Sequence, residues 1–173
     1  MLYLMIMCRA LLAAVFAVAI AGKVRGRSAY DEYVSSIVVL KILPRTVSVM
    51  AAHALVAAEA AAVVLLALPW TVPLGFAAAV GTLAALTGGI LAALRRGRQA
   101  PCRCFGASVT PLGRPHVIRN LVLLTAGGIG LAAWAVAGAS PAHPAGVALA
   151  LVAAAVGALL VVRLDDLLEL FTA

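Results

Sequence analysis

Five long apolar runs dominate the chain, and each is long enough to form a helix that crosses a membrane. A helix needs about 20 apolar residues to span a hydrocarbon core of ~30 Å. The runs extend over about residues 2–22, 46–68, 72–94, 116–138 and 145–162. Short proline-containing turns, 68–73 and 138–144, connect the second run to the third and the fourth to the fifth. Each of these two pairs is therefore predicted to form a helical hairpin.

Two shorter segments alternate polar and apolar positions at helical spacing. After the first run, Ser28 is a plausible helix cap, and Asp31 and Glu32 follow it as first-turn acids. Apolar positions then recur up to Lys41, and Pro44 is predicted to end the segment. This pattern is typical of an amphipathic helix that lies at a membrane interface. A shorter amphipathic segment is predicted at the C-terminus, over residues 163–173.

The composition places the chain among membrane proteins. Of its 173 residues, 65% are hydrophobic and 11% are charged, whereas soluble domains have about a quarter of their residues charged. We therefore predict one domain, residues 1–173, with an all-α fold: a bundle of about five transmembrane helices with a short interfacial helix after the first. The expected environment is a lipid bilayer. The net charge of +7 does not indicate nucleic-acid binding, because the basic residues gather in short loops between helices.

The distribution of these basic residues predicts the orientation of the chain. Loops on the cytoplasmic side of a membrane are enriched in Lys and Arg. With five crossings, one side has nearly all of them: Lys23, Arg25, Arg27, Lys41, Arg45, Arg95, Arg96, Arg98, Arg103, Arg114, Arg119 and Arg163. Arg9 is the exception. The N-terminus is thus predicted outside, and the C-terminus and the loop that contains Cys102 and Cys104 in the cytoplasm.

The first run is interpreted as a retained helix and not as a cleaved signal peptide. It has no basic segment before the apolar core, and Arg9 lies where that core should begin. The apolar run also continues into Gly22 and Lys23, as a membrane helix would.

The candidate chemistry is a pair of thiols, Cys102 and Cys104, in the basic loop between the third and fourth runs. Cysteines this close can form a strained disulfide, and strain makes a disulfide easier to reduce. Arg103 between them favours the thiolate, which is the reactive species. Three interpretations stay open at this point: thiol–disulfide redox chemistry, binding of a soft metal such as copper(I), and a pair of inert cysteines. A zinc site needs two further ligands, and His116 is the only histidine nearby. No cofactor is predicted, since nothing supports copper(I) or a quinone.

Other polar residues lie within the apolar runs. Glu59 is in the second, where an ionisable side chain is costly and suggests function. It either takes up protons or pairs with a basic residue such as Lys23 or Arg119 and holds helices together. Asn120 and Arg119 begin the fourth run, where Asn120 could hydrogen-bond to the cysteine loop and Arg119 could extend to the interface. The third cysteine, Cys8, is predicted to be a buried small hydrophobic residue.

Several of these features, taken in order, resemble the methylamine-utilisation MauE family of DoxX-like membrane proteins. The matching features are Phe16 to Lys23, Pro44, Glu59, the Cys102-Arg103-Cys104-Phe105-Gly106 segment, and Arg119-Asn120. They cover about residues 10–135. Arg103 departs from the pattern, because the family commonly has a small residue there.

The resemblance implies a thiol–disulfide redox role in the maturation of exported, disulfide-containing or thioredoxin-linked proteins. It implies Cys102 and Cys104 as the reacting residues, with Glu59, Lys23, Arg119 and Asn120 in support. Arg103 is a further supporting residue because its charge favours the thiolate. The expected location is the bacterial cytoplasmic membrane, and the expected partner is a thioredoxin-like protein, an exported client or a larger membrane complex. Two alternatives stay open: a copper(I)-handling accessory protein, and a non-enzymatic subunit that anchors a larger assembly.

Overall fold

The computed structural model describes residues 1–97, 113–137 and 142–164. Within these residues it has six helices and no strand. They are α1 (Leu2–Val24), α2 (Arg27–Val39), α3 (Arg45–Ala67), α4 (Val72–Arg95), α5 (Arg114–Val136) and α6 (Pro144–Val162). Five of these helices are long and apolar enough to cross a membrane. The predicted all-α membrane bundle is confirmed, and the five spans begin and end within two residues of the predicted positions.

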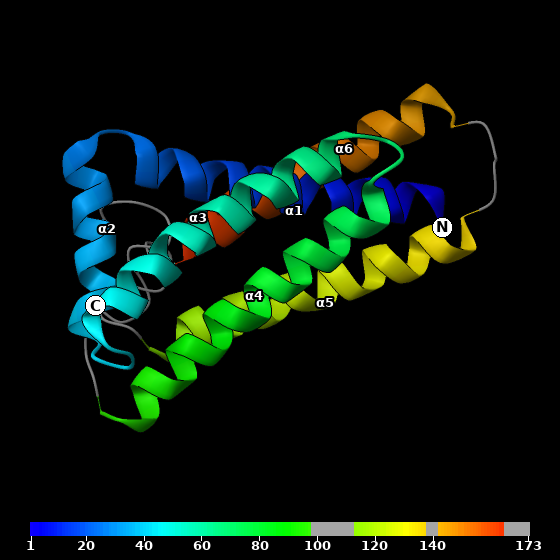
Figure 1. Cartoon of the computed structure of the whole chain (residues 1–173). Coiled ribbons are helices and arrows are strands. Elements are labelled where there is room, and N and C mark those ends of the chain that lie inside the picture. Colours follow the sequence, from blue (N-terminus) through cyan, green and yellow to red (C-terminus); the bar gives the residue numbers. More distant parts are fainter. Residues whose placement is uncertain (98–112, 138–141, 165–173) are drawn as a thin grey trace.

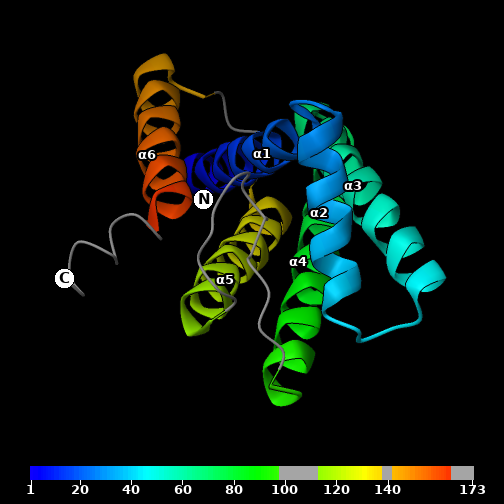
Figure 2. The same ribbon diagram turned by 90° about the vertical axis from the view of Figure 1, so that its left-hand side faces the viewer.

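The helices pack around α1. It contacts α6, α5 and α3 extensively, and α3–α4 and α4–α5 form two further pairs. In Figure 1, α2 runs across one end of the bundle, where α1 ends, α3 begins, α4 ends and α5 begins. We call this end, with its connecting segments, the α2 end. Figure 2 views the molecule from that side.

The segment after α1 differs from the sequence prediction at both of its ends. The helix begins at Arg27 with Gly26 as its N-cap, so Ser28 is not the cap, and its hydroxyl lies 3.2 Å from Glu32 Oε1. The helix ends at Val39 and not at Pro44. The physical reason is Lys41, whose φ of 47° lies in the left-handed region and takes the chain out of the helix. Pro44 instead caps the start of α3.

The predicted hairpin of α3 and α4 is confirmed by the packing of these helices around a short turn. The Thr71 hydroxyl donates a hydrogen bond to the Leu65 carbonyl at 2.7 Å and so satisfies the end of α3. Gly75 permits the close approach of α4, because a Cβ atom there would lie 2.8 Å from the backbone nitrogen of Leu66. Trp70, in the turn, is exposed, as expected of an aromatic residue at a membrane interface.

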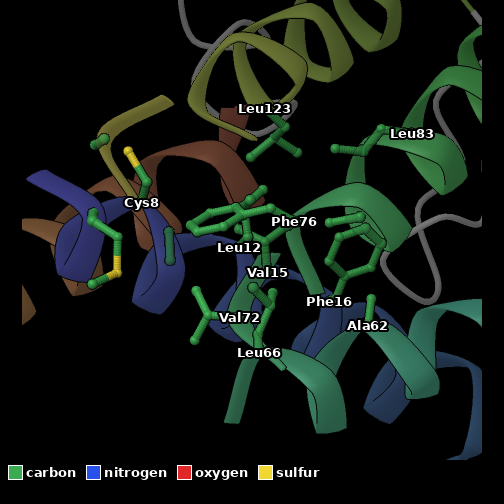
Figure 3. Packing of buried hydrophobic residues seen from close by; sticks show 14 residues of the cluster. Cys8, Leu12, Val15, Phe16, Ala62, Leu66, Val72, Phe76, Leu83 and Leu123 are labelled. Carbon is green, nitrogen blue, oxygen red and sulfur yellow. The ribbon is translucent and has the colours of Figure 1, made fainter. Parts of the chain in front are cut away.

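The apolar core joins α1 to its neighbours at the middle of the bundle. Figure 3 shows Leu12 and Phe16 of α1 packed with Phe76 of α4 and Leu66 of α3, and Cys8 lies in the same cluster. Cys8 is buried, so its predicted role as a small buried hydrophobic residue is confirmed. Many large apolar side chains on the outside of the helices are exposed, which is the surface that a bilayer covers.

Candidate functional site

The cysteine pair belongs to the segment that connects α4 to α5. Cys102, Arg103 and Cys104 lie outside the described residues. The structure describes the helices on either side of them. Helix α4 ends at Arg95 and α5 begins at Arg114, and these two helices pack against each other. Both of these helix termini lie at the α2 end.

A buried ion pair joins the last turn of α1 to the middle of α3. The Lys23 ammonium donates a hydrogen bond to Oε1 of Glu59, and the two residues are only 2% and 1% exposed. The Lys23 Nζ also lies 4.9 Å from the ring centroid of Tyr33 on α2, within the range of a cation–π interaction. The sequence left two roles open for Glu59, proton uptake or pairing with a basic residue. In the structure Glu59 is paired with Lys23. The pair fixes α1, α2 and α3 relative to one another.

The second oxygen of Glu59 has no hydrogen-bond partner among the described residues. Glu59 Oε2 is buried and unsatisfied there, although a carboxylate can accept several hydrogen bonds. A buried polar atom without a partner costs free energy, and such atoms are rare in native proteins. Glu59 therefore pairs with Lys23 through one oxygen and has its second oxygen buried beside the pair.

The first two turns of α5 contribute a further set of buried polar side chains: His116, Arg119 and Asn120. Arg119 is 2% exposed, so it lies inside the protein and does not extend along the outside to the interface. The amide nitrogen of Asn120 has no hydrogen-bond partner in the described part of the chain. These residues directly follow the cysteine segment in sequence and point into the bundle.

Two polar residues have local roles. Nδ1 of His53 donates a hydrogen bond to the Val49 carbonyl at 2.7 Å, and its ring packs edge-on against Tyr30 at 5.6 Å between centroids. His53 thus makes a local hydrogen bond within α3. Among the described residues, no group of three or more His, Cys, Asp or Glu side chains could hold a metal ion.

Sequence reasoning did not find the role of Arg9. Its guanidinium donates hydrogen bonds to the carbonyls of Leu66 and Ala67, the second at 2.8 Å. These carbonyls end α3 and have no partner within their own helix. A single arginine inside an apolar run was the available signal, because such a residue must find acceptors within the protein.

Of three comparisons with known proteins, one identifies a family. The sequence profile of the family described as methylamine utilisation protein MauE matches residues 1–135, which include α1 to α4 and nearly all of α5. No curated protein and no solved structure matches the chain. The profile covers well over half of the sequence, and the chain therefore belongs to the MauE family of multi-pass membrane proteins.

Proposed function

We propose that this protein is a membrane thiol–disulfide redox protein that acts through Cys102 and Cys104. Its role would be the maturation of disulfide-containing or thioredoxin-linked exported proteins. The observation that carries the proposal is a set of buried polar side chains inside the bundle, two of them on the helix that follows the cysteine segment. Lys23 and Glu59 are paired inside the bundle, and Arg119 and Asn120 are buried in the helix that follows the cysteines.

The proposed reaction is a two-step exchange. The thiolate of one cysteine attacks a sulfur of the partner's disulfide, forms a mixed disulfide and releases one partner thiolate, which takes up a proton. The second cysteine then attacks the mixed disulfide, which forms the Cys102–Cys104 disulfide and releases the second partner thiol. The partner gains two electrons and two protons. A dithiol protein of the thioredoxin class would return the pair to its reduced form by the same exchange.

The basic residues around this segment favour the chemistry. Arg95 and Arg96 end α4, Arg103 lies between the cysteines, and Arg114 begins α5. Positive charge near a thiol stabilises the thiolate and raises the fraction that can react. A strained ring between closely spaced cysteines would also make their disulfide easy to reduce, which suits a relay better than a structural bond.

The orientation is part of the proposal. The N-terminus would be outside, and the cysteine segment and the C-terminus in the cytoplasm of the bacterial inner membrane. The partner that exchanges directly with the cysteines would then meet them on the cytoplasmic side, and an exported client outside would be reached only through a further carrier across the membrane. The charges at the α2 end support it: Arg25, Arg27, Lys41, Arg45 and Arg96 lie there. Arg9, the exception near the opposite end, has its guanidinium engaged by the end of α3. It is thus a packing residue and not a free charge of a loop.

The test is a thiol-trapping titration with a membrane-impermeant maleimide. The parent protein is a Cys8→Ala variant, so that only Cys102 and Cys104 react, and the matched controls are Cys102→Ser and Cys104→Ser in that parent. Across a series of redox buffers, we expect both thiols of the parent to be oxidised together in one reversible two-electron transition. The ratio of disulfide to dithiol should change tenfold per ~30 mV of redox potential. Either serine control should abolish it. Thiols that stay reduced throughout overturn the redox proposal.

Further measurements distinguish the alternative functions and test the orientation. Stoichiometric copper(I) that survives purification and is lost in the double serine variant would replace redox with metal handling. Full activity of the double serine variant would assign the protein to an anchoring role. Labelling from inside-out vesicles but not from intact cells supports the cytoplasmic placement. The reverse pattern overturns the orientation and leaves the redox proposal in place.

A further inference from the structure

A cavity of about 540 Å³ lies between α2, α3 and α4. α3 and α4 meet at their hairpin turn and diverge toward the other end of the bundle, where α2 crosses (Figures 1 and 2). Small residues hollow both of its walls: Ala51, Ala54 and Ala58 on α3, and Gly81, Ala85 and Gly89 on α4. Ala54, Gly81 and Ala85 are exposed. The cavity therefore opens on the outer surface of the bundle, which the bilayer covers.

The hydroxyl groups of the described residues that line the cavity are engaged by the backbone. Tyr33 donates to the Ala52 carbonyl at 3.4 Å and Ser36 to the Tyr33 carbonyl at 2.6 Å. Ser48 and Thr82 donate to the carbonyls of Leu43 and Ala78, at 3.2 and 2.8 Å. No lining hydroxyl has a proton left for a ligand. The rest of the lining is aliphatic, and such a surface suits a hydrocarbon chain better than a polar ring.

The depth of the cavity matches one leaflet of a bilayer. Its lining on α3 extends from Ser48 to Ala58, ten residues apart, or about 15 Å at the helical rise. That is half of a hydrocarbon core of ~30 Å. The volume of about 540 Å³ is within the range of roughly 300–1,000 Å³ that is common for ligand sites.

Cationic side chains surround the outer end of the cavity. Leu40, Ile42 and Leu43 line it, and the exposed Lys41 lies between them in sequence. Nη1 of Arg96 donates to the Ile42 carbonyl at 3.0 Å, which holds this exposed residue at the same rim. Exposed Arg45 begins α3 directly after the loop. Residues 40–48 and 90–97 contain no Asp or Glu, so the rim is positive.

We propose that this cavity is a binding site for an anionic phospholipid. One acyl chain fills the space between α3 and α4, and the phosphate lies against Lys41, Arg45 and Arg96. Basic clusters between membrane helices attract anionic headgroups in this way. The apolar lining and the depth of one leaflet favour binding of an acyl chain, and the positive rim favours a negatively charged headgroup. The proposal uses no residue of the cysteine segment, and its test does not depend on redox activity.

The experiment is native mass spectrometry of the purified protein, delipidated and then loaded with equimolar dioleoyl phosphatidylglycerol and dioleoyl phosphatidylcholine. The wild-type protein should retain one phosphatidylglycerol. Gly89→Leu fills the cavity, because a Cβ atom there has open space around it, and it should reduce retention at least tenfold. Gly88→Leu is the matched control: its Cβ also has open space, but Gly88 does not line the cavity. A second pair, Ala54→Leu against Ala57→Leu, tests the opposite wall.

The headgroup is tested separately with Lys41→Gln, Arg45→Gln and Arg96→Gln. We expect the preference for phosphatidylglycerol over phosphatidylcholine to fall about fivefold for each cation removed. Equal retention by Gly89→Leu and Gly88→Leu overturns the acyl-chain site. Equal binding of the two lipids to the wild-type protein overturns the anionic headgroup. A tightly retained isoprenoid quinone that phosphatidylglycerol does not displace overturns the choice of ligand.

Discussion

Replacing either member of the Lys23–Glu59 pair should destabilise the protein far more than replacing an exposed ion. The two side chains are 2% and 1% exposed, so solvent does not screen the charge that is left behind. Removal of one partner from a buried pair costs about 3–5 kcal/mol, whereas an exposed pair is worth about 0–1 kcal/mol. We therefore expect Lys23→Met and Glu59→Met each to lower the free energy of unfolding by about 3–5 kcal/mol.

The double variant provides the sharper test. With both charges replaced by methionine, no buried ion remains, and substitution of a whole buried pair by apolar residues is often neutral or stabilising. The double variant should therefore be more stable than either single variant. A matched control is Glu32→Met, the same substitution at an exposed position of α2, which should change stability by at most about 0.5 kcal/mol.

The assay uses the third cysteine as a reporter of unfolding. Cys8 is buried in the core, so in a Cys102→Ser/Cys104→Ser parent a fluorogenic maleimide reacts only after the protein opens. At roughly 2–4 °C per kcal/mol for a chain of this size, the single variants should melt roughly 6–20 °C below the parent. A double variant that loses the sum of both single losses would refute the reasoning, because the two residues would then act independently.

Three further outcomes follow from close contacts in the structure, each measured by the same melting assay or by labelling. Gly75→Ala should cost about 1–3 kcal/mol, because its Cβ would meet the Leu66 backbone at 2.8 Å; Gly81→Ala, with open space at its Cβ, is the control and should be neutral. Arg9→Gln should cost about 1.5–3 kcal/mol, the worth of hydrogen bonds from a charged group, and a loss below 0.5 kcal/mol would contradict the role of this residue in ending α3. Cys8 in the folded parent should resist the maleimide, and rapid labelling without heating would contradict its burial.

The membrane-spanning part of the fold could be predicted from sequence because lipid imposes a simple rule. Every backbone polar group in the hydrocarbon must be satisfied within its own helix, so the length of an apolar run almost fixes the helix. The interfacial segment obeys no such rule. Its start at Arg27, after the N-cap Gly26, and its end at Val39, before Lys41, depend on backbone conformation. The pattern of polar and apolar residues does not contain that information.

The sequence could predict which buried ionisable residues need a partner, but not which partner each residue has. An ionisable residue inside an apolar run indicates that a partner exists, and Glu59 and Arg9 are both examples. The sequence does not say which partner, because that depends on how α1 and α3 rotate against each other. From the sequence, Glu59 could pair with any of several basic residues. The packing of the helices shows that its partner is Lys23. The acceptors of Arg9 are backbone carbonyls, and the pattern of side chains along the sequence does not indicate which carbonyls lie near it.

Helix α6 contains none of the residues proposed to react or to support the reaction. The family profile ends at residue 135, before α6, and α6 has no charged residue. Ala150, Ala154 and Ala158 are its buried residues, spaced one helical turn apart, and α6 packs mainly on α1. Small residues on one face allow two helices to approach closely in lipid, where association depends on packing. We infer that α6 holds α1, and with it Lys23, against the rest of the bundle, while α1 to α5 and the connection between α4 and α5 contain every residue proposed to react or to support the reaction.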